Sequence, residues 1–273
     1  MTLLPFPHLL DARPNFIASE PVPISCDQGT QLIKCKGRWF AVFPEPALIT
    51  AGTSDNVIAL DPGVRTFLTG FDGSKFLEFG AGDMGRITRL CQHLDNLISR
   101  IAKCQNRRQR QKMRIAAGRM RTKIQDLANE VHKQVSCYLS ENYRVLILPT
   151  FETSQMVQKV KRKIRSKTAR AMLSWAHYRF KLFLKQTALC RGCTVVEVTE
   201  EYTSKTCTRC GHIHVKLGGA KKFKCRECGH TLPRDFNGAF GIMLKALSDT
   251  TFAINDDGVA IVALHDNMSC SVA

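Results

Sequence analysis

Two pairs of cysteines in the last third of the chain constrain its fold more than any other feature. Cys207 and Cys210 form one C-x-x-C pair, Cys225 and Cys228 form a second, and a glycine follows each pair directly. This spacing lets each pair turn both thiolates toward one cation, and the glycine permits the backbone to turn away. The pattern predicts a ribbon held by one structural zinc ion with four sulfur ligands.

Disulfides are the alternative explanation for the cysteines, because the chain contains 12 of them. The N-terminus lacks the basic start and uninterrupted apolar core of a secretory signal, which favours an intracellular protein with reduced thiols. No apolar run is long enough to cross a bilayer, so no membrane partner is expected. A third pair, Cys190 and Cys193, has no matching pair and is interpreted as core.

The charge of the chain points to a polyanionic partner. The 273 residues carry a formal net charge of +17, and an excess of this size is typical of proteins that bind nucleic acid. Two basic blocks contain no acidic residue. One comprises Arg107, Arg108, Arg110, Lys112, Arg114, Arg119, Arg121 and Lys123. The second supplies the predicted nucleic-acid-binding residues, which are Lys159, Lys161, Arg162, Lys163, Arg165, Lys167 and Arg170.

Hydrophobic periodicity predicts a mixed α/β fold. Three antiparallel strands, a helix, a strand, a helix, a strand and a helix are expected in that order, which is the order of an RNase H-like fold. The strands are expected at 57–60, 66–71, 75–79, 145–148 and 195–198, and a separate hairpin at 32–43. The helices are expected at 87–101, at 120–139 after a basic turn, at about 158–190, and after Asp235.

Two aspartates are placed where such a fold could use them. Asp61 ends the first strand before a Pro-Gly turn, and Asp235 precedes the last helix. Taken singly, Asp61 could be an ordinary turn residue and Asp235 an ordinary N-cap. Enzymes of this fold hydrolyse phosphodiesters with two divalent cations held by converging carboxylates, and Mg²⁺ favours such oxygen ligands.

Four separated stretches resemble Fanzor proteins, the eukaryotic and viral relatives of transposon-encoded TnpB (OrfB-type) RNA-guided nucleases. They are Asp61-Pro-Gly-Val-Arg-Thr-Phe, 148–156, 201–211 and Arg234-Asp-Phe-Asn, and the resemblance runs from about residue 32 to 247. It implies a split RuvC-type nuclease domain, interrupted by the zinc ribbon, that cuts DNA guided by a transposon-end RNA. It also implies that Asp61 is the first RuvC acid and Asp235 the third, with two catalytic Mg²⁺ ions.

The second acid departs from the TnpB pattern, in which a glutamate ends the strand that here ends in Pro149. Fanzors are similar in placing a substitute just before the Tyr-Thr-Ser sequence, where this chain has Glu200 and Glu201. The strands 145–148 and 195–198 should be parallel neighbours about 4.8 Å apart, a shift that a glutamate side chain can absorb. Glu200 is the favoured ligand, Glu201 the alternate, and Glu152 ranks third.

The resemblance also predicts the domain organisation. Residues 1–50 are expected to be a remnant of an N-terminal wedge-like region in a shortened copy of the family. Residues 51–202 and 232–250 would form the nuclease domain, 203–231 the target-nucleic-acid-binding zinc ribbon, and 251–273 a tail. A DNA endonuclease with a guide RNA, nuclear in a eukaryotic host, is one hypothesis. An inactive relic or regulator that only binds nucleic acid is the other.

Overall fold

The structure is a computed structural model that describes residues 18–23, 29–44, 54–150, 166–199, 202–215, 217–218, 220–254 and 260–264. In 249–254 and 260–264 only the backbone is described. The chain divides into two compact units, Met1–Leu48 and Ile49–Ala273.

The second unit is built around a five-stranded mixed sheet in the order β5-β4-β3-β6-β7. Strands β3, β4 and β5 pair antiparallel, whereas β6 is parallel to β3 and β7 is parallel to β6. The bounds are β3 (Val57–Pro62), β4 (Leu68–Phe71), β5 (Phe76–Phe79), β6 (Val145–Pro149) and β7 (Thr194–Val198). The predicted set of three antiparallel strands followed by two parallel additions is therefore confirmed.

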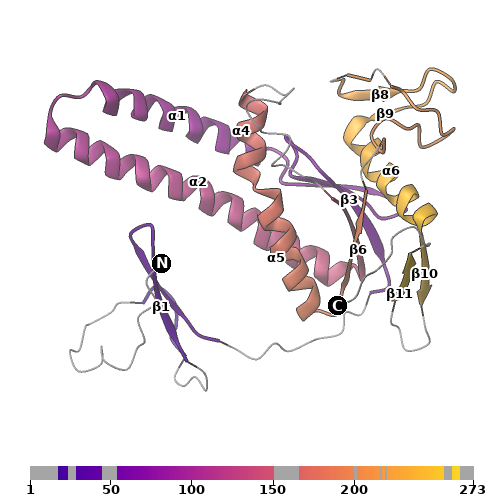
Figure 1. The fold of residues 1–273 in the computed structure, drawn as a ribbon, viewed down its shortest axis with the longest axis horizontal. Coiled ribbons are helices and arrows are strands. Elements are labelled where there is room, and N and C mark those ends of the chain that lie inside the picture. Colours follow the sequence, from indigo (N-terminus) through magenta and orange to yellow (C-terminus); the bar gives the residue numbers. More distant parts are fainter. Residues whose placement is uncertain are drawn as a thin grey trace, which may run out of the picture. The chain divides into compact units, whose positions relative to one another are not determined.

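Four helices cover one face of this sheet (Figure 1). They are α1 (Asp83–Lys103), α2 (Arg107–Asn142), α4 (Ser166–Trp175) and α5 (His177–Cys190). Their buried side chains pack on Ile58 and Leu60 of β3 and on Leu146 and Leu148 of β6. These even-numbered strand residues share one face because side chains alternate along a strand.

Helix α6 (Arg234–Asp249) covers the opposite face. Its apolar side packs on Ala59 of β3, Ile147 of β6, and Val196 and Val198 of β7. Alternation along β3 puts the side chain of Asp61 on the face of Ala59, toward α6. The sheet is thus the middle of three layers, and the predicted first acid emerges on the α6 side.

Two helix predictions need correction. The basic block 107–123 was expected to be a turn, but it forms the first half of α2, which is N-capped by the Asn106 side chain accepting from Gln109 N at 3.0 Å. The long helix expected at about 158–190 is interrupted within its described part at Ala176, whose φ and ψ are 51° and 51°. This left-handed conformation separates α4 from α5 and changes which side chains face the sheet.

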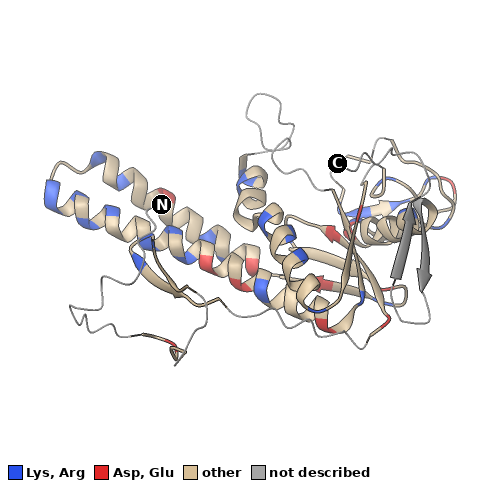
Figure 2. Cartoon of the chain, turned by 60° about the horizontal axis from the view of Figure 1, so that its bottom comes forward, with Lys and Arg blue, Asp and Glu red and all other residues tan. Residues whose placement is uncertain are grey.

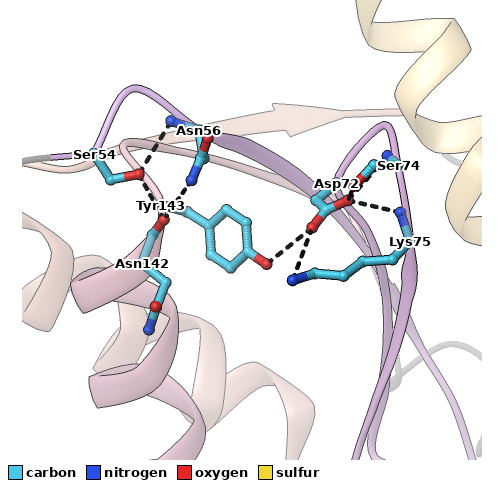
Figure 3. A network of polar contacts seen from close by, with 7 residues as sticks. All are labelled: Ser54, Asn56, Asp72, Ser74, Lys75, Asn142 and Tyr143. Atoms are coloured by element: carbon cyan, nitrogen blue, oxygen red, sulfur yellow. Dashed lines mark hydrogen bonds and ion pairs between the residues drawn. The ribbon is translucent and has the colours of Figure 1, made fainter.

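A polar network ties the end of α2 to the β4–β5 turn (Figure 3). The hydroxyl of Tyr143 donates to Asp72 Oδ2 at 3.4 Å, and the Asp72 carboxylate also caps the turn by accepting from the backbone N–H groups of Ser74 and Lys75. Burial by itself would raise the pKa of Asp72, but these backbone hydrogen bonds and the nearby Lys75 ammonium lower it. The β4–β5 turn is thereby fixed to the helical layer.

Three two-stranded hairpins complete the described chain. The first unit contains β1 (Gln31–Cys35) and β2 (Arg38–Val42), which confirms the hairpin expected at 32–43. The ribbon contains β8 (Lys222–Lys224) and β9 (Thr231–Pro233). The tail, to which no structure was assigned, contains β10 (Thr250–Ile254) and β11 (Ala260–Leu264). Among the described helices, none has the length and hydrophobicity needed to span a membrane.

Candidate active site and zinc ribbon

The carboxylate of Asp61 lies against the backbone of α6. A Cβ atom built on Gly238 would clash with Asp61 Oδ2 and lie 3.1 Å from Asp61 Cγ. Real Cβ atoms almost never approach another heavy atom within 3.0 Å, so any larger residue at this position would require the Asp61 carboxylate to shift. Asp235 is three residues before Gly238, and residues at i and i+3 share a helix face. The structure therefore brings the two predicted acids to the same stretch of α6.

The loop that follows β7 also rests on α6. A Cβ on Gly241 would lie 2.6 Å from the carbonyl oxygen of Thr203, and Thr203 is buried. Glu200 and Glu201 precede this residue but lie outside the described residues, as does Glu152. The choice among these three glutamates therefore stays a prediction, and the described residue that reaches the helix touched by Asp61 is Thr203.

The first turn of α6 is joined to the ribbon by Asn237, whose side chain is fully buried. Its Nδ2 donates to the carbonyl of Thr206 at 2.9 Å, and its Oδ1 accepts from the hydroxyl of Thr208 at 3.3 Å. Arg234, just ahead of the acid, donates to the carbonyl of Gly218 at 2.7 Å. The ribbon thereby holds both sides of Asp235, which is itself exposed.

The four predicted cysteine ligands come together with a geometry that fits zinc. Their sulfur atoms all lie within 4.8 Å of one another. Cys207 Sγ is 3.7 Å from Cys228 Sγ, and Cys210 Sγ is 3.6 Å from Cys225 Sγ. Sulfurs bound tetrahedrally at about 2.3 Å from one zinc are separated by about 3.8 Å. The cluster is consistent with one structural zinc ion.

The backbone and the neighbouring thiols shift the pKa values of two of these cysteines in opposite directions. Hydrogen bonds from the backbone N–H groups of Cys228 and Glu227 lower the pKa of Cys225 to about 6, which favours the thiolate that a metal requires. The pKa of Cys210 is raised, because a backbone hydrogen bond from His212 is outweighed by hydrogen bonds with the other three thiols and by burial. Gly211 and Gly229 adopt φ values of 76° and 68°, a left-handed conformation that lets the backbone turn after each pair as expected. Among the described residues, these cysteines are the one group of three or more potential ligands that could share a metal ion.

The predicted nucleic-acid-binding residues are described only in part. Lys159, Lys161, Arg162, Lys163 and Arg165 lie outside the described residues, whereas Lys167 and Arg170 are in α4. Arg170 is ion-paired with Asp95 of α1, with Nη2 2.8 Å from Oδ1, and this hydrogen bond lowers the pKa of Asp95. Arg170 therefore joins two helices in addition to any contact with a phosphate. Figure 2 shows the positions of Lys and Arg residues, in blue, spread along the α1–α2 hairpin.

The sequence of this region matches a known family. Residues 177–242 match the model described as "Cas12f1-like, TNB domain", which spans α5, β7, the four cysteines and the start of α6. "Putative transposase A625R" of Paramecium bursaria Chlorella virus 1 is 36% identical over 199 residues, which cover 72% of this chain and 44% of that protein. The chain belongs to the TnpB-like/Cas12f-like family of transposon-associated nucleases.

Two further similarities show how much of the length of related proteins this chain covers. "Putative RNA-guided DNA endonuclease InsQ" of Escherichia coli (strain K12) is 26% identical, with 76% of this chain and 54% of that protein covered. A solved structure titled "Cryo-EM structure of CRISPR-Cas12f Ternary Complex" matches with a TM-score of 0.53 and 16% identity, covering 78% of this chain and 44% of that chain. The chain spans about half the length of the relatives it matches, and the structural similarity concerns the fold.

Sequence reasoning missed Gly238 and Gly241, which receive Asp61 and the Thr203 loop. A detectable signal was present, because two glycines lie within one predicted helix, at a cost in helix propensity of about 1 kcal/mol each. Trp175 and Phe180 are buried in the core, whereas Tyr178 is 61% exposed.

Proposed function

We propose that this protein is a metal-dependent DNA endonuclease with an RNase H-like, RuvC-type active site. The observation that carries the proposal is the contact of Asp61 with α6 at Gly238, one turn beyond Asp235. Both acids offer oxygen ligands that suit Mg²⁺. In such sites two Mg²⁺ ions, when bound, activate a water molecule and stabilise the leaving 3′-oxygen. In this proposal the chain supplies the metal ligands, which are carboxylates from β3, α6 and the loop after β7 that share one site.

Strand alternation supports Glu200 as the third ligand. Val196 and Val198 of β7 pack on α6, so the next residue with the same parity is Glu200, whereas Glu201 has the parity of Glu197. Glu197 lies on the opposite face, where Lys181 Nζ of α5 binds it at 2.8 Å. If the backbone continues extended beyond Val198, Glu200 faces the same side of the sheet as Asp61.

The strand register explains why the second acidic ligand would follow β7 instead of ending β6. Ala59 is opposite Ile147, so two residues further along Asp61 falls in one row with Pro149, and Pro149 is opposite Val198. Proline offers no ligand atom, and the neighbouring β7 ends in the same row. A glutamate two residues past Val198 can reach back toward Asp61 from there.

Nucleic acid is the proposed substrate and partner. The matched relatives include an enzyme named as an RNA-guided DNA endonuclease, and the net charge of +17 favours phosphate binding. We propose that DNA is the substrate and that a transposon-end RNA is the guide. We also propose that, within the family, this chain is of the Fanzor type that its motifs resemble.

The decisive experiment is Mg²⁺-dependent cleavage of DNA by the purified chain, with and without RNA transcribed from its own locus. Cleavage that requires Mg²⁺ and disappears in both Asp61→Asn and Asp235→Asn would support the proposal. Binding of nucleic acid without cleavage under any of these conditions would favour the second candidate, a relic that retains the ribbon and the basic helices.

A further inference from the structure

The connection that follows Asp61 is held by two aromatic side chains on either side of a helix break. The carbonyl of Gly63 accepts a hydrogen bond from His177 Nε2 at 3.1 Å, and the carbonyl of Val64 accepts one from Trp175 Nε1 at 3.0 Å. Two consecutive carbonyls are therefore bound, beginning two residues after the proposed metal ligand. Both donors come from the α4–α5 junction, which lies far from Asp61 in the sequence.

The break at Ala176 is what allows both donors to reach one loop. An α-helix has 3.6 residues per turn, so residues 175 and 177 of a continuous helix would point in directions about 160° apart. Ala176 instead has φ 51° and ψ 51°, and the hydrogen bonds from Ala176 N to Met172 O and from Phe180 N to Ala176 O continue on either side. A left-handed alanine costs about 1–2 kcal/mol, and such strain is typical of functional sites.

The two donors are rigidly supported. Both side chains are buried, and the ring of the fully buried Phe67 stacks on His177 with 5.0 Å between centroids and 5° between planes. Phe67 also lies 4.9 Å from the Trp175 ring. The α4–α5 break is also held by α2, because His132 Nε2 donates to the carbonyl of Trp175 at 2.7 Å. Burial lowers the pKa of His177 to about 4, so the neutral ring donates through Nε2 at physiological pH.

The Asp61 connection is itself tightly folded. Gly63 N donates to the carbonyl of Phe67 at 3.0 Å, and a Cβ on Gly63 would clash with the carbonyl oxygen of Thr66. The loop therefore cannot shift at Gly63 without breaking contacts at its other end. A hydrogen bond that fixes the Gly63 carbonyl consequently fixes the direction in which β3 delivers Asp61.

We propose that His177 and Trp175 are positioning residues that hold the Asp61-Pro62-Gly63-Val64 connection so that the Asp61 carboxylate meets the metal beside α6. The inference rests on the proposed function, because it assigns these residues a role through the proposed ligand. Neither side chain touches the metal or the substrate. Their effect is on metal affinity, since partners that orient a ligand typically change that affinity about 10–100-fold.

The test compares His177→Phe, which keeps a stacked ring but has no donor, with His177→Gln, which retains an N–H donor. Mn²⁺ binding to the full chain is measured by electron paramagnetic resonance, and hydrogen exchange of residues 62–67 is measured without metal. We expect Mn²⁺ affinity to fall about 10–100-fold in His177→Phe, with faster exchange of this segment, and to be largely restored in His177→Gln. Trp175→Phe should weaken Mn²⁺ binding in the same direction.

The outcomes separate the inference from the function. Unchanged Mn²⁺ affinity in His177→Phe, in a protein whose wild type binds Mn²⁺ and whose Asp61→Asn variant does not, overturns the positioning role and leaves the nuclease proposal standing. Equal weakening by His177→Phe and His177→Gln also overturns it, because the donor then has no special effect. A wild type that binds no Mn²⁺, or binds it equally without Asp61, overturns both.

Discussion

The carboxylate of Asp61 meets helix α6 at Gly238, where the helix offers bare backbone to the acid. This contact joins the first strand of the sheet to a helix near the other end of the chain. It also shows why a glycine occupies the interior of a helix whose neighbouring residues are apolar. A side chain here would occupy the space that the carboxylate needs.

We first predict that Gly238→Ala disables the site although alanine is the better helix former. Displacing Asp61 by about 1 Å can cost about 100-fold in rate, and forcing the methyl group into this contact should offset the gain in helix propensity. DNA cleavage and urea unfolding are the measurements. The matched control is Gly118→Ala in α2, where a Cβ meets no atom within 4 Å. That control should raise the free energy of unfolding by about 1 kcal/mol and leave cleavage unchanged.

The second prediction concerns the displaced acid. Glu200→Gln should abolish cleavage while leaving DNA affinity intact, because the strand alternation proposed above would put Glu200, and not Glu201, on the side of Asp61. Glu201→Gln and Glu152→Gln should be nearly neutral. Single-turnover cleavage and filter binding are the measurements. The reverse result for Glu200 and Glu201 would move the role by one residue, and full activity in both variants would remove the displaced glutamate from the mechanism.

Third, Cys225→Ser should lose the bound zinc and with it the order of the ribbon. Asn237 connects the ribbon to the first turn of α6, so we also expect the cleavage activity to fall. Zinc is quantified by elemental analysis of the purified variants. Cys190→Ser is the control, because Cys190 lies outside the four-cysteine cluster, and its zinc content should equal that of the parent. A Cys225→Ser protein with undiminished zinc would falsify the assignment of the ligands.

Fourth, replacing Lys161, Arg162, Lys163 and Arg165 together with glutamine should flatten the salt dependence of DNA binding. Each lost phosphate contact lowers the slope of log affinity against log salt by about 0.9 for duplex DNA. The control replaces Arg144 and Arg191, which are ion-paired with Asp55 and Glu141. Its slope should match that of the parent. A quadruple variant that keeps the parental slope would show that these four cations face solvent.

The fifth prediction uses the buried histidines. Burial lowers the pKa of His177 from 6.5 to about 4 and also lowers the pKa of His132. Between pH 6.5 and pH 4 the unfolded chain therefore binds more protons than the folded chain, and stability decreases as the pH falls through this window. His177 alone should contribute a loss of about 2 kcal/mol between pH 7 and pH 5. Urea unfolding at both pH values should show a smaller loss for His177→Gln than for the parent.

The sequence alone determined those features that depend on local spacing. The cysteine pairs specified the ribbon because two residues between thiolates suffice to turn both toward one ion. Alternating and helical periodicities predicted the strands and their order, since each element must bury one face. The position of Asp61 near the end of β3 was visible for the same reason, because Pro62 and Gly63 interrupt the pattern.

Only the tertiary structure decided which distant groups meet. Gly238 makes room for the carboxylate of Asp61, which belongs to β3, and no periodicity in α6 predicts that contact. The break at Ala176 was hidden because the residues around it have ordinary helix-compatible patterns. Its left-handed backbone is maintained by long-range contacts of Trp175 and His177 with the Asp61 connection. Local propensities are worth less than about 1 kcal/mol per residue, so packing between segments far apart in the chain overrides them.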